Sequence, residues 1–168
     1  IELGLDRVRE VATRLGLEMG QPTAESPDIM SFDTRPSFTL GAVEVSPLSL
    51  ISAYSTFANR GVHCEPNIIA SIKTRTGKEV DPPKTECKRV ISKDVADGIN
   101  KIFQGPMNAG TARPAKVPGV QMAGKTGTVS DNKAVWTIGY TPELVGGAVI
   151  SYDSDPAWSS FWKKHKTR

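Results

Sequence analysis

The chain has 168 residues, a net charge of +3 and 38% apolar residues. These values are typical of one globular domain and exclude wholesale disorder and collagen-like repeats. The charge is too small to indicate nucleic-acid binding, and no zinc-ligand spacing, aromatic RNA-binding motif or heptad run occurs. No stretch approaches the ~18 consecutive apolar residues of a membrane span. The chain starts with Ile rather than Met, so we expect a fragment or a processed product.

Three segments in the first two thirds have the pattern of helices. Apolar residues at three- and four-residue spacing between Leu3 and Leu17 predict an amphipathic helix that ends at Gly16. Ser46-Pro47 predicts the start of a buried helix, with Ser46 as its N-cap and a stop at residues 59–61. Ser92 predicts the cap of a third helix, which Gly105-Pro106 is expected to stop.

Between these helices the sequence predicts irregular structure. Residues 20–37 are rich in Pro, Ser, Asp and Thr and read as a surface stretch. Residues 68–73 read as a short strand, 76–78 as a turn and 80–88 as a Pro-rich loop.

The last third predicts three extended runs joined by polar turns, at 120–129, 134–140 and 144–152. We interpret them as an antiparallel meander with helices packed on its faces, an α+β fold. The two later runs carry apolar or small residues on both faces, which predicts strands covered on two sides. Three aromatic residues follow, which we expect to form a closing helical turn against the sheet or a partner-facing patch; they are Trp158, Phe161 and Trp162.

The two cysteines, Cys64 and Cys87, are too few for a structural zinc site without further Cys or His ligands nearby. The residues alone leave two alternatives open, a pair of free buried thiols or one disulfide. A disulfide closing a loop of this length would stabilise the fold by about 3 kcal/mol in the chain-entropy model. It would also require an oxidising compartment.

Candidate chemistry lies in the first extended run, at Lys125-Thr126-Gly127-Thr128. Glycine inside a strand costs stability, so Gly127 between two threonines indicates close approach by a ligand. Alternation places Lys125 and Gly127 on one face of the strand and the two threonines on the other. A strand edge that offers positive charge and hydroxyl groups suits an extended peptide with an acidic end.

Lys125 to Thr128 resembles the third motif of the penicillin-binding transpeptidases, which use Ser-x-x-Lys, Ser-x-Asn and Lys-Thr-Gly. Other stretches resemble the same family in the same order, and together they cover roughly residues 1–153, more like class A than class B members. The stretches are 40–48, 53–61, 110–112 and 134–142. The resemblance implies the penicillin-binding and β-lactamase-like fold, and no cofactor or metal.

The resemblance also implies an activity. Such enzymes acylate an active-site serine with the D-Ala-D-Ala end of a peptidoglycan stem peptide, and β-lactams mimic that dipeptide. Lys125 would be the electrostatic catalytic residue, and the Thr128 backbone N–H would be one donor of the oxyanion hole. Thr126, Gly127 and Thr128 would bind the substrate. The expected location is the extracytoplasmic face of the bacterial membrane, with the anchor outside this chain, and there the pairing of Cys64 with Cys87 becomes the favoured alternative.

The sequence departs from the family pattern because neither Ser-x-x-Lys nor Ser-x-Asn precedes Lys125. Ser130-Asp131-Asn132 spells the second motif and Ser160-Phe161-Trp162-Lys163 the first, but both come in the wrong order. We interpret the former as turn chemistry and Ser160 as a surface residue. We therefore expect the C-terminal part of a transpeptidase domain at 1–153 and a tail at 154–168. The nucleophile is then expected on a missing or separate upstream segment.

This hypothesis names as partners the stem peptide, β-lactams and the N-terminal remainder of the same domain, and no nucleic acid. Three alternatives stay open. The first is that the chain belongs to a D,D-carboxypeptidase or β-lactamase of the same fold, although no extra base for deacylation is identified. The second is a non-catalytic module that binds β-lactam or stem peptide. The third is an unrelated α+β domain in which the motif is accidental.

Overall fold

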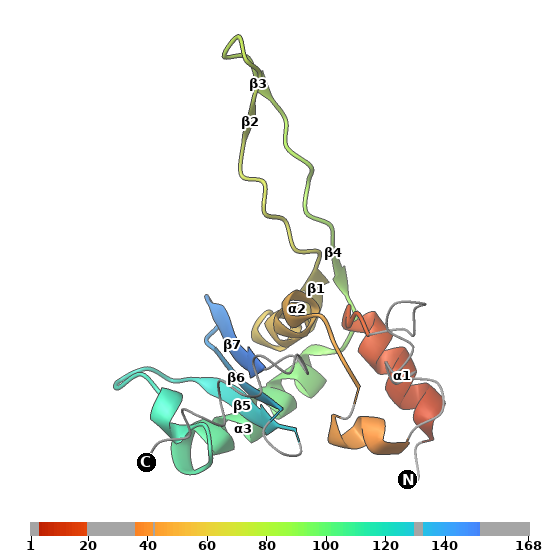
Figure 1. Cartoon of the computed structure of the whole chain (residues 1–168), viewed down its shortest axis with the longest axis vertical. Coiled ribbons are helices and arrows are strands. Elements are labelled where there is room, and N and C mark those ends of the chain that lie inside the picture. The colour runs from red at the N-terminus through yellow and green to blue at the C-terminus, as the bar shows by residue number, and fades with distance from the viewer. Residues whose placement is uncertain (1–3, 20–35, 42, 130–132, 152–168) are drawn as a thin grey trace, which may run out of the picture.

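A computed structural model of the chain describes residues 4–19, 36–41, 43–129 and 133–151. The helices in chain order are α1 (Leu5–Arg14), the 3₁₀ helix η2 (Pro36–Leu40), α2 (Pro47–Ala58), α3 (Lys93–Ala109) and the 3₁₀ helix η3 (Arg113–Ala115). The strands are β1 (Val62–Cys64), β2 (Ile72–Lys73), β3 (Glu79–Val80), β4 (Cys87–Arg89), β5 (Ala123–Thr128), β6 (Ala134–Tyr140) and β7 (Val145–Ser151). Figure 1 shows a compact body from which one arm projects.

The three C-terminal strands form an antiparallel sheet in the order β5-β6-β7. Gly127 lies opposite Trp136, and Ile138 lies opposite Gly147. The predicted meander and the α+β fold class are thus confirmed.

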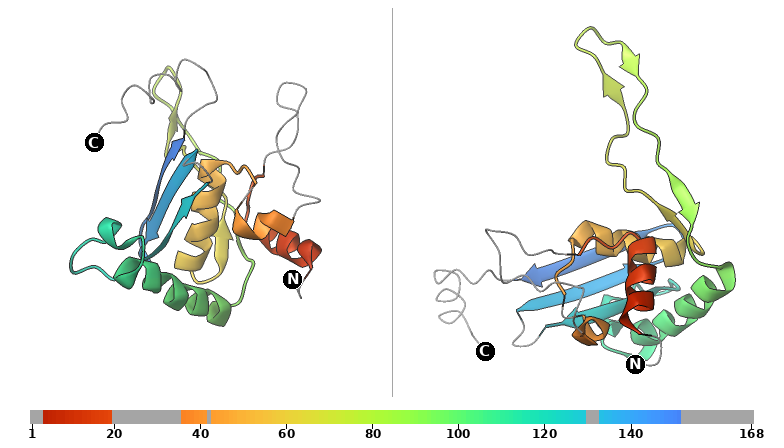
Figure 2. Two further views of the ribbon diagram at one scale, coloured as in Figure 1. Left: turned by 60° about the horizontal axis from the view of Figure 1, so that its bottom comes forward. Right: turned by 90° about the vertical axis from the view of Figure 1, so that its right-hand side faces the viewer.

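Helix α2 covers one face of this sheet, and α3 lies along β5 (Figure 2). A Cβ on Gly147 would lie 2.7 Å from Ile51 Cγ1, so glycine lets α2 approach β7 closely. Four aromatic rings join the three elements, because Tyr54 and Phe57 of α2 meet Phe103 of α3 and Tyr54 also meets Tyr140 of β6. Tyr140 is buried and the other three rings are half-buried, and aromatic contacts of this kind contribute strongly to core packing.

Helix α3 runs through Pro106 to Ala109, so the prediction that Gly105-Pro106 stops it is wrong. Proline in a helix interior removes one backbone hydrogen bond and crowds the preceding turn. Packing of the following turn outweighs this cost, since Met107 is fully buried beneath β5 and β6. The helix begins as predicted, with the Val95 N–H donating to Ser92 Oγ at 3.3 Å.

The expectation of strands covered on both faces is met by neither strand: on β6, Val135 lies on the face opposite Ile138 and is 38% exposed. Ile138 and Tyr140 of β6 are buried, whereas Ile150 of β7 is 69% exposed. Leu144, just before β7, is 74% exposed. Within the described residues, α2 supplies the neighbours of only one face of β7.

The first helix ends next to Gly16 as predicted, whereas the capping of the second differs from the prediction. Helix α1 begins at Leu5 and ends at Arg14, and Gly16 follows it with a φ of +77°, which favours glycine. Ser46 occupies the N-cap of α2 but its side chain makes no capping bond. Ser49 takes over a local role instead, because its hydroxyl donates to the Ser46 carbonyl (2.9 Å) and accepts from the Glu18 N–H (3.0 Å).

Residues 65–86 form the arm, which the sequence predicts as a strand and a Pro-rich loop. The predicted strand at 68–73 is reduced to β2, which pairs with β3 near the tip. At the root, β1 pairs with β4, and a disulfide joins Cys64 to Cys87 directly across the two strands. The disulfide agrees with the alternative that the family resemblance favours, whereas the sequence analysis predicts no strand at β1 or β4 and so misses their pairing.

Candidate functional site

The four residues of the candidate motif lie at one end of β5, an outer strand of the sheet within the described part of the chain. The strand changes character along its length. Ala123 and Gly124 are buried, whereas Lys125 and Thr128 are exposed. A Cβ on Gly124 would meet Met107 Cε and the Ile138 carbonyl oxygen. The strand is therefore anchored by its first half and accessible at its second.

The backbone of this accessible half offers free groups at the edge. Antiparallel pairs alternate between residues bonded to the neighbouring strand and residues whose N–H and C=O point away from it. The Val129 N–H donates to the Ala134 carbonyl at 2.9 Å. Counting back along the register, Gly127 and Lys125 bond to β6, whereas Thr126 and Thr128 direct their N–H and C=O groups outward. The Thr128 N–H is thus a donor at the open edge.

Lys125 supplies positive charge at the same edge. Its Nζ donates to the outward Thr126 carbonyl at 2.7 Å, and it forms no ion pair with a carboxylate of the described residues. An ammonium group without a neutralising partner attracts an anionic ligand.

Thr126 has a partner that sequence reasoning misses. Its hydroxyl shares a short hydrogen bond with the hydroxyl of Thr111, in the turn that follows α3. No spacing rule predicts this contact, because the two residues are 15 positions apart and meet only once α3 packs along β5. The resemblance places Thr111 in a family-like turn without giving it a role.

Gly127 leaves space rather than filling it. A Cβ there would meet only Trp136 Cβ, at an ordinary contact distance of 3.6 Å. The fold itself therefore tolerates a methyl group at this position, in contrast to Gly124.

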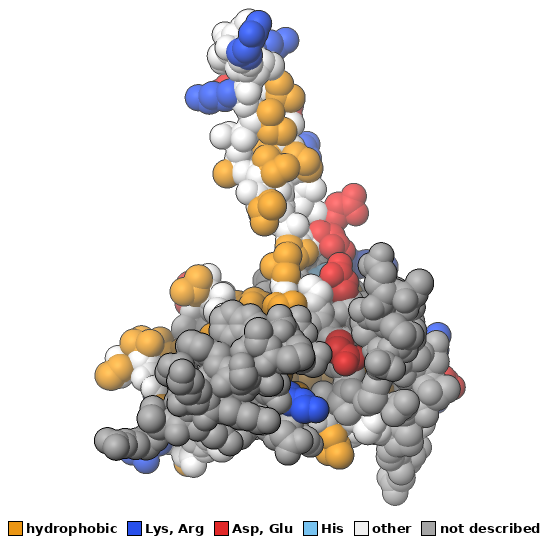
Figure 3. Space-filling view, viewed as in Figure 1, with side chains coloured by type: hydrophobic (Ala, Val, Ile, Leu, Met, Phe, Trp, Pro, Cys, Tyr) orange, Lys and Arg blue, Asp and Glu red, His pale blue; other side chains and the backbone are white. Residues whose placement is uncertain are grey.

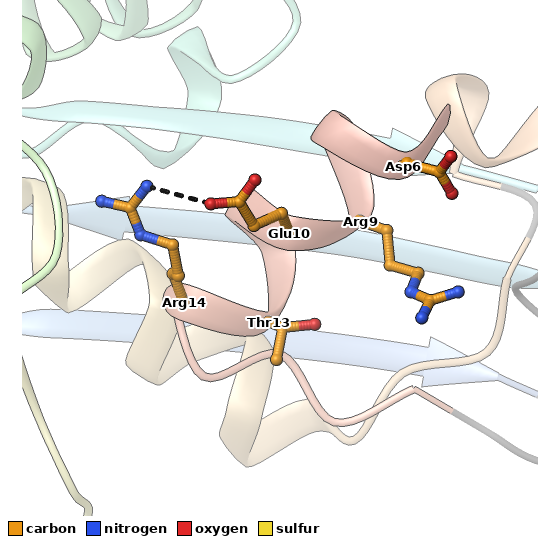
Figure 4. A pocket seen from close by; sticks show the side chains of 5 residues that line it. All are labelled: Asp6, Arg9, Glu10, Thr13 and Arg14. Carbon is orange, nitrogen blue, oxygen red and sulfur yellow. Dashed lines mark ion pairs between the residues drawn. The ribbon is translucent and has the colours of Figure 1, made fainter. Parts of the chain in front are cut away.

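Two hollows are formed by the described residues away from the motif, and neither is lined by residues 125–128. One hollow, shown in Figure 4, lies on the surface of α1 alone and is lined by Asp6, Arg9, Glu10, Thr13 and Arg14. A second, of ≈ 470 Å³, lies on the sheet face opposite α2, around Met122, Thr137 and Gly139. The motif supplies one wall, the strand edge, and a groove needs a second wall.

Shifted pKa values in the described chain mark structural contacts rather than this edge. Burial raises the pKa of Tyr140, whose hydroxyl donates to Asn100 Oδ1 at 2.8 Å. The Arg60 guanidinium, which donates to the Asp97 carboxylate, lowers the pKa of Asp97. Neither pair lies on β5.

Several sequence predictions fall outside the described residues, namely those on Ser130-Asp131-Asn132, on Ser160 and on the aromatic residues from 158 onward. Among the residues that the structure does describe, no three His, Cys, Asp or Glu side chains gather in a way that would hold a metal ion. No helix of the same residues is long and apolar enough to cross a membrane.

Comparison with known proteins gives a consistent result. The family described as "Penicillin binding protein transpeptidase domain" matches residues 1–152. Penicillin-binding protein 1A of Aquifex aeolicus is 34% identical over 152 residues, covering 90% of this chain and 19% of the relative. Penicillin-binding protein 1F of Bacillus subtilis is 35% identical over 147 residues, covering 83% and 20%. The chain thus spans about a fifth of the length of these relatives.

The fold is also shared with solved structures. The PonA1 protein of Mycobacterium tuberculosis in complex with penicillin V matches with a TM-score of 0.69 at 24% identity. The match covers 87% of this chain and 40% of that one. A family match over residues 1–152, relatives about a third identical and a common fold lead to one conclusion. This chain belongs to the penicillin-binding protein transpeptidase domain family.

Proposed function

We propose that this chain carries the substrate-binding strand of a peptidoglycan D,D-transpeptidase, a serine acyltransferase that acts on the D-Ala-D-Ala end of a stem peptide. The observation that carries the proposal is the open edge of β5, where the outward Thr128 N–H lies beside the unneutralised Lys125. Membership of the family and the penicillin V complex of PonA1 support it.

Each residue of the edge has a role in this proposal. An extended D-Ala-D-Ala segment lies along β5 as an added strand. Its terminal carboxylate is bound by the Thr126 and Thr128 hydroxyls and attracted by Lys125. A serine attacks the carbonyl of the penultimate D-Ala, and the Thr128 N–H stabilises the negative oxygen that forms. The peptide C–N bond breaks, D-Ala leaves with a proton, and an amine of a second stem then takes the acyl group from the serine.

The serine nucleophile is supplied, in this proposal, by sequence outside these 168 residues. Ser-x-x-Lys does not occur before Lys125 in the printed sequence. The relatives are about five times as long as this chain, which leaves room for the first two motifs. That remainder of the domain would also provide the second wall of the groove.

The same remainder is proposed to complete the sheet at β7. If the outer edge of β5 binds substrate, the sheet can grow only beyond β7. There, Ile150 is 69% exposed, and an exposed apolar strand edge is an aggregation hazard unless it is covered. Residues 1–153 would then be the C-terminal part of the domain and 154–168 its tail, on the extracytoplasmic face of the membrane.

The proposal is tested by acylation with a fluorescent penicillin, using the whole protein that carries this chain. Lys125→Ala should slow acylation by a factor on the order of 10², as for loss of one transition-state contact. Lys101→Ala, which removes an exposed lysine of α3, is the matched control and should react at the normal rate. The masses of the peptides released by proteolysis should place the label outside residues 1–168.

A substitution at Gly127 separates binding from folding. Gly127→Ala should keep the normal unfolding temperature and lose acylation rate, because its methyl group fits the fold and obstructs only the ligand edge. Equal rates for Lys125→Ala, Gly127→Ala and the unchanged protein would overturn the assignment of β5. Absence of any label on folded protein would instead favour a non-catalytic module.

A further inference from the structure

The arm, residues 65–86, does not take part in the proposed reaction. It leaves the body at the Cys64–Cys87 disulfide and ends in a turn at residues 74–77. Figure 1 and the right view of Figure 2 show it projecting from the body. Few hydrogen bonds join its two sides between the root and the tip. Among them, the Glu65 N–H donates to the Glu86 carbonyl (2.9 Å) and Asn67 Nδ2 donates to the Pro83 carbonyl (2.7 Å).

Apolar side chains line the middle of the arm. Ile68 is 91% exposed, Ile69 42% and Val80 44%. Figure 3 shows the hydrophobic groups as a continuous band below the tip. A two-stranded ribbon is marginally stable alone in water, and contiguous exposed apolar surface marks an interaction site. We therefore interpret the band as a surface that contacts a partner.

Charge divides the arm into two opposite halves. The outer half, residues 71–80, carries three basic residues (Lys73, Arg75 and Lys78) against Glu79, a net charge of +2. The inner half, residues 65–70 and 81–86, carries three acidic residues (Glu65, Asp81 and Glu86) against Lys84, a net charge of −2. In Figure 3 the basic groups gather at the tip and acidic groups where the arm meets the body.

This pattern disfavours two kinds of partner. A membrane-inserting hairpin carries its apolar residues at the tip, whereas residues 74–77 are Thr, Arg, Thr and Gly. An anionic polymer would leave the acidic half unmatched, because the arm as a whole is neutral. The partner must instead offer a basic region, an apolar centre and an acidic region in the reverse order.

A second copy of the same arm meets this requirement. We infer that two copies of the protein associate through their arms, which lie antiparallel about a two-fold axis. The basic outer half of each arm faces the acidic inner half of the other, and Ile68, Ile69 and Val80 of both copies meet near the axis. Such an isologous interface is closed, so association stops at a dimer.

Charge reversal provides a test that breaks none of the side-chain hydrogen bonds or ion pairs described for the arm. The tip variant, Arg75→Glu with Lys78→Glu, turns the outer half to −2. The root variant, Asp81→Lys with Glu86→Lys, turns the inner half to +2. All four side chains are exposed. Sedimentation velocity of the whole protein should show a dimer for the unchanged chain, and each variant alone should dimerise at least about tenfold more weakly, because like charges then face each other.

The decisive sample is an equimolar mixture of the two variants. In the antiparallel arrangement the acidic tip of the tip variant faces the basic root of the root variant at one end. At the other end the basic tip of the root variant faces the acidic root of the tip variant, so the mixture should regain the dimer. A single chain with all four changes should regain it too. An unchanged protein that is monomeric at its highest soluble concentration would overturn the inference, as would a dimer that neither variant weakens or a mixture that stays monomeric. Penicillin labelling should be normal in every variant, so a failure here is distinct from a failure of the proposed function.

Discussion

The body and the arm of this molecule are stabilised in different ways. The body encloses a core in which Ala96 and Met107 have no exposed surface, and the Tyr54 ring of α2 meets both Phe103 of α3 and Tyr140 of the sheet. Among the described residues the arm has no such core, and its Ile68 side chain is 91% exposed. Burial stabilises the body, whereas a covalent bond at the root constrains the arm. Substitutions of the same kind should therefore have very different effects in the two regions.

The largest effect is expected at Gly124, where the body has no spare volume. Gly124→Val would place side-chain atoms against Met107 and the Ile138 backbone, and overpacking against backbone cannot be relieved by a side-chain rotation. We expect loss of the folded sheet, seen as loss of the cooperative thermal transition. Gly77→Val at the tip of the arm is the control, since it meets no atom within 4 Å, although its φ of +84° adds a local strain. A cooperative, nearly normal transition for Gly124→Val would contradict the packing of α3 on β5.

A matched pair of isoleucines compares burial directly. Ile138→Ala empties a site that is 2% exposed and should cost about 2–5 kcal/mol of unfolding free energy. Ile68→Ala changes a side chain that is 91% exposed and should stay within about 0.5 kcal/mol. Urea unfolding followed by tryptophan fluorescence measures both. Comparable losses would mean that the arm folds back on the body.

The disulfide tests how far the arm depends on its root. Replacing Cys64 and Cys87 together by Ser should lower the free energy of unfolding by about 3 kcal/mol, because the open chain gains conformational freedom in the unfolded state. Amide exchange should become faster in β1 and β4 and stay slow in β6. Faster exchange throughout the β5–β7 sheet would show that the two regions are not separable.

The smallest effect concerns exposed ion pairs. The Arg60 guanidinium lowers the pKa of Asp97, so this contact stabilises the folded chain above the ordinary pKa of 3.8 and ceases to do so as the pH falls through the lowered value. Asp97→Asn should therefore be slightly less stable than the unchanged protein at neutral pH and equally stable in acid. Glu79→Gln, which breaks the exposed 3.3 Å pair with Lys73 on the arm, should have no effect at either pH. Urea unfolding at both pH values measures the differences in unfolding free energy. A large loss for Asp97→Asn, or one that persists in acid, would contradict the prediction.

Local pattern predicted much of the body. The alternation and turns after residue 120 predict the meander, and Ser46-Pro47 predicts the start of α2, because these signals act between residues close in sequence. The Lys125 to Thr128 motif is predicted to lie on an extended strand, and the structure places it on β5. By contrast, the length of α3 beyond Pro106 depends on burial of Met107, a contact that no neighbouring residue encodes.

The sequence by itself determined the fold class, the family and the strand that carries the candidate motif, because periodicity and motif order are properties of the chain alone. Only the tertiary structure decided that Thr111 meets Thr126, that the N–H of Thr128 points to an open edge, and that residues 65–86 stand away from the body. Each of these depends on how segments distant in sequence pack and pair. Such packing sets the direction of a backbone group and the exposure of a side chain, and neither is a property of a short stretch of residues.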